Sequence, residues 1–163
     1  MDFGGLVKIV FAGLTDEIEA WPPVDSETLW AEPLGNSLCR LDNIPFFARG
    51  VAFNDIVKVD NVNGELIFRS VDRHCGHSTY RLLYEKEGLP AVDDAIAQIR
   101  ASGCSTEGSK KWQMVAIDIP PTVVVDQIYA MMEEFEQRQI LGFEEGFYFD
   151  PRAKAKEAAS DEG

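Results

Sequence analysis

The fold of this chain is decided by residues 28–59, which read TLWAEPLGNSLCRLDNIPFFARGVAFNDIVKV. In this segment short β-prone runs alternate with turn-forming residues, which are Pro33, Gly35, Asn36, Asn43 and Gly50. Short strands bounded by such residues are typical of a compact β unit. The segment holds none of the usual catalytic signatures. It therefore predicts a scaffold rather than an active-site loop.

The runs on either side of this segment extend the β pattern. Strands are predicted at residues 6–11, 26–31, 38–41, 51–60 and 65–71, and the second and third are expected to pair as a hairpin. No helical periodicity precedes residue 76. Because closure hides the edges of a set of short strands, we predict an N-terminal small β barrel-like lobe over residues 1–76.

The pattern changes after residue 77. Strands are predicted at residues 79–85, 111–119 and 143–149, with room for a further short strand at 105–109. One helix is predicted from Pro90 to the C′ glycine Gly103, and a second is predicted to follow Thr122, which is expected to cap it. This order makes the chain an α+β protein whose residues 77–150 form a C-terminal ferredoxin-like (split βαβ) α/β sandwich. Residues 151–163 are expected to be a flexible charged tail.

The charge balance indicates which classes of binding partner are expected. The 163 residues include 28 acidic and 15 basic side chains, which gives a net charge of −13. Such a surface repels phosphates and anionic lipids, so no nucleic acid and no membrane partner is expected. A basic protein partner is favoured, because opposite fields speed encounter. The alternative is that the acidity serves solubility alone.

The cysteines and the apolar runs indicate the compartment. Three cysteines with irregular spacing, Cys39, Cys75 and Cys104, argue against a disulfide framework and fit a reducing cytosol. The N-terminal apolar run is short and lacks a basic n-region, so it predicts a first strand and not a signal peptide. No apolar run reaches the roughly 20 residues that cross a bilayer. We therefore expect a cytoplasmic protein.

One cluster has the composition of a metal or catalytic site, namely His74-Cys75-Gly76-His77. Adjacent His74 and Cys75 would point to opposite faces of a strand, and no spaced Cys or His pair completes a zinc shell. A nucleophilic site would join Cys75 or Cys104 with His77, but no nucleophile motif surrounds them. The more favoured interpretation is a hinge histidine that hydrogen-bonds across the two lobes. No metal, no cofactor and no catalytic residue is therefore predicted.

Carboxylates gather near the end of the second predicted helix and in the last strand. These residues are Glu133, Glu134, Glu136, Glu144 and Glu145. A charge run is commonly a solvated face, and the alternative is a negative patch that binds a basic partner. Trp21 lies in an acidic, proline-containing connection, where it is either an exposed anchor for the same partner or a staple that holds the connection to the barrel.

Several separated motifs together resemble a known family. They are LWAEPLG at 29–35, LDNIPFFARGVAF at 41–53, GHSTYR at 76–81, EGS at 107–109 and AIDIPP at 116–121. In this order they resemble the bacterial family called domain of unknown function 4265. The resemblance implies a small cytosolic bacterial domain and brings no established activity. Within the GHSTYR motif, His77, Ser78, Thr79 and Arg81 are expected to form the joint between the two lobes.

These observations favour a non-enzymatic binding protein. The working hypothesis is an immunity protein, which would neutralise a bacterial toxin, such as a nuclease, by occluding its active site. An acidic inhibitor would complement the basic substrate groove of a nuclease. Two alternatives stay open: a metal- or Cys/His-dependent enzyme, and a regulatory domain that binds a small ligand in a pocket between the lobes.

Overall fold

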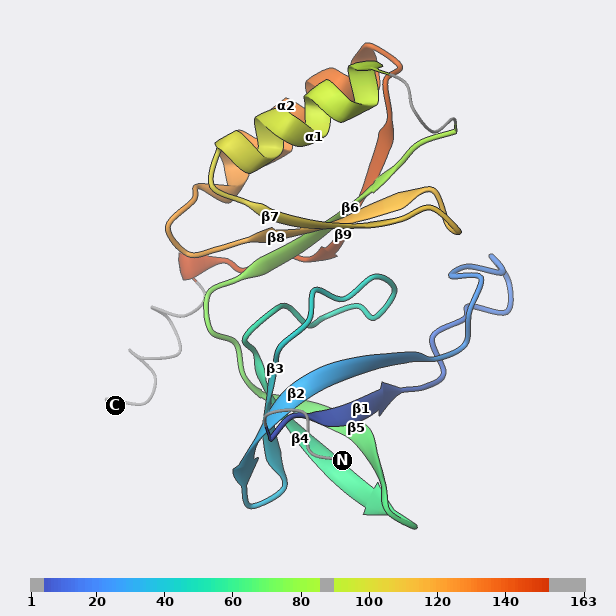
Figure 1. Ribbon diagram of the computed structural model, residues 1–163, viewed down its shortest axis with the longest axis vertical. Helices are drawn as coiled ribbons and strands as arrows, with labels where there is room; N and C mark the ends of the chain where they lie inside the picture. Colours follow the sequence, from blue (N-terminus) through green and yellow to red (C-terminus); the bar gives the residue numbers. More distant parts are fainter. Residues whose placement is uncertain (1–4, 86–89, 153–163) are drawn as a thin grey trace.

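The computed structural model describes residues 5–85 and 90–152 of the chain. Its strands form two lobes that are stacked along the longest axis of the molecule (Figure 1). The first lobe is a closed five-stranded barrel and the second is a four-stranded antiparallel sheet with two helices. The mixed α+β class and the N-terminal barrel predicted from the sequence are thus confirmed. The predicted tail lies outside the described residues beyond Arg152.

The barrel is built from five consecutive strands, which are β1 (Val7–Phe11), β2 (Glu27–Gly35), β3 (Leu38–Leu41), β4 (Ile56–Val62) and β5 (Glu65–Arg73). Successive strands pair antiparallel, and the predicted β2–β3 hairpin is confirmed. Because five is an odd number, β1 must meet β5 in parallel to close the barrel, which it does by pairing Ile9 with Leu66 and Val10 with Ile67. Alternate apolar side chains such as Ile9, Leu41 and Val57 point inward and form the core.

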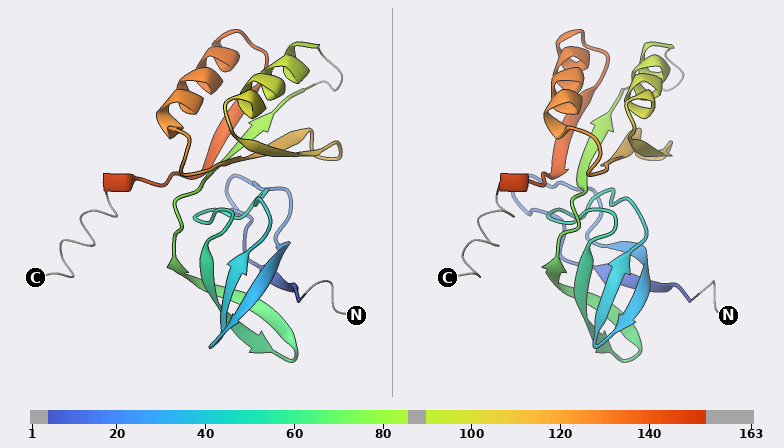
Figure 2. Two further views of the ribbon diagram at one scale, coloured as in Figure 1. Left: turned by 60° about the vertical axis from the view of Figure 1, so that its left-hand side comes forward. Right: turned by 90° about the vertical axis from the view of Figure 1, so that its left-hand side faces the viewer.

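The second lobe follows the order β6 (Ser78–Leu83), α1 (Pro90–Ala101), β7 (Ser105–Ser109), β8 (Met114–Ile119), α2 (Val125–Gln137) and β9 (Gly142–Phe147). The sheet order is β7-β8-β6-β9, with all neighbours antiparallel. The short strand for which the sequence left room at 105–109 is β7. Both helices cover the same face of the sheet (Figure 2). Their apolar stripes, including Ile99, Met132 and Phe135, pack there against Tyr80, Leu82 and Ile117.

The other face of the sheet rests on the barrel lobe. The connection between β3 and β4 lies between the barrel strands and the sheet in both orientations of the molecule (Figure 2). This connection explains a difference from the sequence-based expectation. A strand was predicted from residue 51, yet β4 begins only at Ile56. The preceding residues are recruited into tertiary contacts with the sheet, such as Thr79 Oγ1 donating to Val51 O at 3.2 Å, which override their β propensity.

The start of α2 also differs from the prediction. Thr122 was expected to cap this helix, but the Val123 N–H donates to Pro120 O and the helix begins at Val125. The N-cap residue is therefore Val124, whose backbone is extended with φ −77° and ψ 114° and whose side chain makes no capping hydrogen bond. An apolar residue thus stands at a position where a polar one is favoured.

Membrane insertion through helices is not indicated within residues 5–85 and 90–152, because neither α1 nor α2 is long and apolar enough to span a bilayer.

The unfilled cap of α2 yields a stability prediction. Val124→Ser should raise the free energy of unfolding by about 1 kcal/mol, because serine can accept a hydrogen bond from an N–H of the first turn. Val124 is 56% exposed, so little packing is lost with its side chain. Urea denaturation of the wild type, Val124→Ser and Val124→Ala checks this expectation. Equal stability of the serine and alanine variants would show that the hydroxyl does not cap the helix.

Candidate functional site

The two lobes meet at a joint that concentrates the buried polar groups. Within the described part of the chain, the buried polar or charged residues are Asp55, Ser78, Thr79, Arg81 and Asp118. All of them lie at or beside this joint, and no buried side-chain nitrogen or oxygen among the described residues lacks a hydrogen-bond partner. Satisfied polar groups at such a density make the joint the first candidate for a functional site.

Arg81 on β6 is the central residue of the joint. Its side chain is fully buried, and its Nε and Nη2 donate to the carbonyl oxygens of Phe46 and Ala48 in the β3–β4 connection, the latter at 2.7 Å. Its Nη1 donates to Glu144 Oε1 on β9 at 3.2 Å. Burial lowers the pKa of the guanidinium, and the neighbouring carboxylate of Glu144 opposes that shift. Arg81 thus ties β6 to the barrel lobe and to β9 at once.

The segment that Arg81 holds is clamped from its other side by Glu27, the first residue of β2. The backbone N–H groups of Phe46, Phe47 and Ala48 donate to its carboxylate at 2.8, 3.2 and 3.0 Å. A carboxylate therefore binds the amides of this short segment while a guanidinium binds its carbonyls. Charge-assisted hydrogen bonds of this kind are stronger than neutral ones, so the segment is held in one conformation.

Two residues of the predicted partner patch take part in the joint. Glu144 accepts from Arg81 and also pairs with Arg49 Nη2 at 3.6 Å. Trp21 Nε1 donates to Glu144 Oε1 at 3.4 Å, and its indole packs edge-on against the ring of Phe47. The Trp21 connection is thus fastened to the joint, which agrees with the staple interpretation of this residue. Glu144 has a structural role, which separates it from the other glutamates.

The two histidines flank the joint in matching arrangements. His74 Nδ1 is 2.8 Å from Asp55 Oδ2, and its ring stacks on Phe147 of β9 at 4.1 Å. His77 Nδ1 is 2.9 Å from Asp118 Oδ1 on β8, and its ring meets the edge of Phe53. Each histidine therefore hydrogen-bonds within its own lobe and contacts an aromatic ring of the other. The expected hydrogen bond across the lobes is replaced by these ring contacts.

Ser78 and Thr79 also hydrogen-bond to residues that are distant in the sequence. Ser78 Oγ accepts from the Phe149 N–H at 2.9 Å, and Thr79 donates to Val51 O. His77, Ser78, Thr79 and Arg81, which the sequence predicted to form the joint, thus all lie in it. Asp55 also accepts from the backbone of Ala52 at 2.9 Å. The Thr79 hydrogen bond joins the two lobes, whereas those of Ser78 and Asp55 stay within one lobe.

The cysteines lie apart from one another, and two of them are in apolar cores. Cys104 packs behind α1, and burial raises the pKa of its thiol to about 11, so it is protonated at neutral pH. Burial also raises the pKa of Cys39 inside the barrel. Neither residue supplies a thiolate nucleophile. In residues 5–85 and 90–152, no three His, Cys, Asp or Glu side chains gather closely enough to hold a metal ion.

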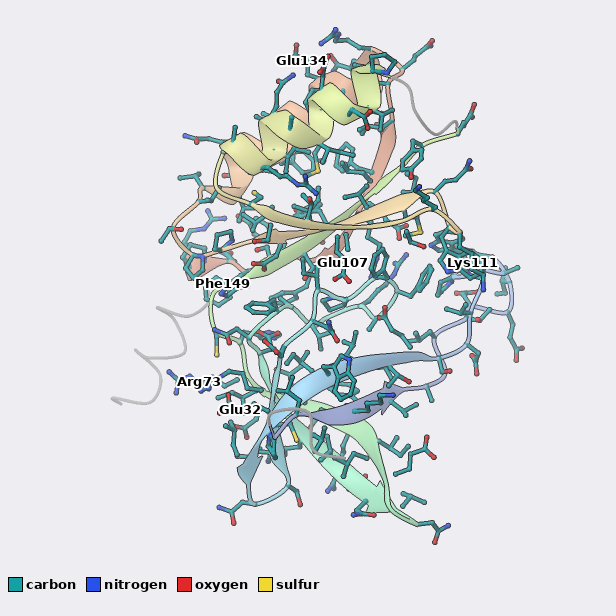
Figure 3. All side chains as sticks on the ribbon, viewed as in Figure 1. Glu32, Arg73, Glu107, Lys111, Glu134 and Phe149 are labelled. Carbon is teal, nitrogen blue, oxygen red and sulfur yellow. The ribbon has the colours of Figure 1, made fainter. Side chains whose placement is uncertain are left out.

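The other predicted carboxylates lie on the surface of the second lobe. Glu133, Glu134 and Glu136 are exposed on α2, and Glu134 lies at the end of the molecule farthest from the barrel (Figure 3). Glu145 on β9 is exposed and accepts a hydrogen bond from the Tyr80 hydroxyl at 2.9 Å. The structure thus brings part of the predicted patch together on the α2–β9 side, while Glu144 and Trp21 belong to the joint.

Two cavities lie beside these elements. One of about 330 Å³ opens at the start of α2, between Gly76 of the joint and the residues that follow β9. The other, of about 380 Å³, is a groove between the lobes, lined by Phe46, Phe47 and Ser26 of the barrel lobe and by Ser109, Lys111 and Trp112 of the second. Lys111 lies beside the connection that joins β1 and β2 (Figure 3). A pocket between the lobes was one of the alternatives that the sequence left open, but the lining of neither cavity was predicted, because each is formed by segments that are distant along the chain.

Comparison with known proteins supports the fold and leaves the activity open. The model of a family described as "Domain of unknown function (DUF4265)" matches residues 27–143. No curated protein matches the chain at a significant level. A solved structure described as "Novel crystal structure of a hypothetical protein from Neisseria gonorrhoeae" superimposes with a TM-score of 0.73 at 19% identity. The match covers 88% of this chain and 96% of that one, and at this identity it shows the fold alone.

The central role of Arg81 yields a matched pair of predictions. Arg81→Met should lower the free energy of unfolding by about 3–5 kcal/mol, because it leaves the carbonyls of Phe46 and Ala48 without their side-chain donor and removes the buried cation that pairs with Glu144. Arg49→Met removes a cation from the same carboxylate, but Arg49 is 60% exposed at its side chain, so the loss should stay below about 1 kcal/mol. Chemical denaturation of both variants tests the difference. Equal losses would contradict the central role of Arg81.

Proposed function

The chain belongs to the DUF4265 family, and we propose that it is a non-enzymatic binding protein that covers a basic surface of a partner protein. The observation that supports this proposal is that its glutamates fall into two groups, one bound at the joint and one exposed on the surface. Glu144 is engaged inside the molecule, whereas Glu133, Glu136 and Glu145 are exposed and no basic side chain of the described residues is paired with them. Together with the net charge of −13, these glutamates offer a negative surface.

The glutamates share one side of the second lobe. Glu133 and Glu136 lie one and two helical turns beyond Tyr129 on α2, so the three side chains project from neighbouring positions of the helix surface. Tyr129 packs against Phe143 of β9 and against Tyr80, whose hydroxyl donates to Glu145. The α2–β9 face, defined here by Tyr129, Glu133, Glu136 and Glu145, therefore combines a partly exposed aromatic ring with three carboxylates. Apolar centres with charged rims are typical of protein interfaces.

The polar groups of the joint support a binding protein over an enzyme. Both histidines orient toward buried carboxylates and contact aromatic rings of the opposite lobe, which gives them a structural role. Cys104, one of the two thiols considered with His77, is packed in the core. With these groups engaged, the exposed charged face is the better place for function.

More specifically, we propose that the protein is an immunity protein. Its partner would be a bacterial toxin with a basic active-site groove, such as a nuclease, which the acidic face would occlude by charge complementarity. The three free thiols suit a reducing compartment, so we place this interaction in the cytoplasm. We also assign the second lobe to the ferredoxin-like class, supported by its β-α-β-β-α-β order and antiparallel sheet.

Charge reversal tests the proposed face. The protein is co-expressed with the product of the adjacent upstream gene, and the complex is isolated and its Kd measured. Glu133→Lys, Glu136→Lys and Glu145→Lys combined should weaken binding by at least about 100-fold, because like charges then face each other across the interface. The free energy of unfolding should change little, since all three residues are exposed.

The matched control reverses three glutamates of the barrel lobe. Glu17→Lys, Glu19→Lys and Glu65→Lys change the net charge by the same amount on exposed residues of the other lobe. This variant should keep a Kd close to that of the wild type at physiological salt, where exposed charges more than roughly 8 Å away are screened. Equal weakening by both variants would show that net charge, and not the α2–β9 face, determines binding.

A second candidate function is favoured by the groove between the lobes. Its walls are the rings of Phe46, Phe47 and Trp112, and Lys111 Nζ lies 4.8 Å from the centroid of the Trp112 ring. No carboxylate of the described residues pairs with Lys111, and the Glu27 carboxylate in this groove is occupied by backbone N–H groups. Aromatic walls with an unpaired cation suit a planar aromatic anion, which would bind both lobes as a regulatory ligand.

A thermal shift measurement tests this candidate with 2-naphthoate as the probe. At a concentration ten times its Kd, the probe should stabilise the protein by about 1.4 kcal/mol. At roughly 2–4 °C per kcal/mol for a chain of this size, this raises Tm by roughly 3–6 °C. Lys111→Met should abolish most of this rise, and 2-naphthylmethanol, which lacks the charge, should give a smaller one. An unchanged Tm with naphthoate would remove the groove as a site for aromatic anions.

A further inference from the structure

The cavity at the start of α2 has the composition of an anchor pocket. Its volume of about 330 Å³ lies in the range of small binding sites. Most of its wall is apolar, from side chains that precede α2, begin it or follow β9, namely Pro121, Val123, Val124, Val125, Phe149 and Pro151. Phe149 lies at the level of the joint, on the side of the molecule where the described chain ends (Figure 3). Filling such a cavity with an apolar group is favourable, because apolar surface on both sides is removed from water.

One residue that lines the cavity, Val124, breaks a local rule of helix structure. Val124 occupies the N-cap of α2 without a capping hydrogen bond, and it is 56% exposed. A serine or aspartate would stabilise the helix at this position. An apolar and exposed side chain at a cap is unfavourable both for the helix and for solvation. Departures from local rules are expected at functional sites, and here the valine completes the apolar wall.

Among the described residues, the charged groups around the cavity are two acids, Asp126 and Asp150, and one base, Arg152, whose Nε pairs with Asp150 Oδ1 at 3.2 Å. Asp126 lines the cavity from the first turn of α2, where the Tyr148 hydroxyl donates to its Oδ1 at 3.5 Å. One turn further along the helix is Tyr129, which is 42% exposed, and Glu133 follows one turn later. The cavity is therefore continuous along α2 with the α2–β9 face. A ligand that fills the cavity meets carboxylates directly beside it.

We propose that this cavity receives one large apolar side chain of a basic protein partner, flanked in the partner's sequence by Lys or Arg. The inference rests on the proposed function and names the anchor within it. The apolar side chain fills the space between Val124, Val125 and Phe149, and the flanking cations meet Asp126 and Glu133. Buried apolar anchors supply most of the affinity of protein interfaces, whereas rim charges mainly set orientation and partner choice.

Peptide titrations of the full chain, followed by two-dimensional NMR, test the proposal. The probe is acetyl-Lys-Lys-Phe-Lys-Lys-amide, with Ser in place of Phe in one control and Glu in place of each Lys in another. The Phe-Lys peptide should shift the amide signals of Val124, Asp126 and Phe149. Its Kd should be at least about tenfold lower than that of the Ser peptide, as burial of an aromatic ring predicts. The Phe-Glu peptide should bind more weakly than the Phe-Lys peptide, because it meets Asp126 with like charge.

Two variants separate the anchor from the acidic face. Val124→Ser removes part of the apolar wall without changing the charge, and it should reduce the Phe-over-Ser preference at least about threefold. Because this substitution should also stabilise α2, a loss of binding cannot be attributed to unfolding. Combined Glu133→Lys, Glu136→Lys and Glu145→Lys should instead weaken both Lys peptides and leave the Phe-over-Ser preference in place.

Three outcomes would overturn the proposal that this cavity receives an apolar side chain of a basic partner. Equal affinities of the Phe and Ser peptides, with both weakened by the glutamate reversals, would reject the anchor while the proposed acidic face stands. Equal binding of the Phe-Lys and Phe-Glu peptides would assign the cavity to apolar ligands irrespective of charge and reject the basic partner here. No binding of either Lys peptide at millimolar concentration would reject the cavity as an anchor site, and the co-purified complex then tests the proposed function independently.

Discussion

The burial of one guanidinium group constrains the rest of this structure. Removing Arg81 from water is unfavourable by several kcal/mol unless its donors meet acceptors with good geometry. The acceptors are Phe46 O and Ala48 O in the barrel lobe and Glu144 on β9. Two segments that are far apart in the sequence, the β3–β4 connection and β9, must therefore converge on β6. The lobes take their relative position from this convergence, since an apolar contact alone would tolerate sliding of one lobe over the other.

The same group dictates the backbone around it. A Cβ atom built on Gly146 would lie 3.3 Å from Arg81 Nη2 and 3.2 Å from Thr79 O, so this position of β9 accepts no larger residue without displacement. The Gly146 carbonyl is in turn bound by the Gly50 N–H at 3.0 Å. The glycine allows β9 to approach both Arg81 and the β3–β4 connection. The clamp of Glu27 on the same connection completes the arrangement, with opposite charges on its two sides.

Local patterns in the sequence predict the elements and not their junction. Alternating apolar residues and turn formers identify the barrel strands, and the period of Val92, Ala95 and Ile99 identifies α1, because these patterns reflect burial on one face. The late start of β4 was missed because contacts with the sheet override local preference there, and the cap at Val124 was missed because a valine carries no capping signal. A signal for the joint does exist: Arg81 and Asp118 are single charges inside otherwise buried strands. The acceptors of Arg81 include backbone carbonyls, which no residue type in the sequence identifies.

The division between joint and surface favours recognition by a rigid face. Tyr129 is held edge-on by Phe143 and Tyr80, and β9, which carries Glu145, is fixed from behind by Arg81 through Glu144. Binding to such a face requires little ordering of side chains, so more of the interaction energy remains as affinity. The neighbouring cavity is lined by Val124, the N-cap residue of α2. At this position the helix has no side-chain capping hydrogen bond, and the valine adds apolar wall to the cavity. Charge buried at the joint thus makes β9 rigid, and that rigidity allows the acidic face beside it to be presented in one conformation.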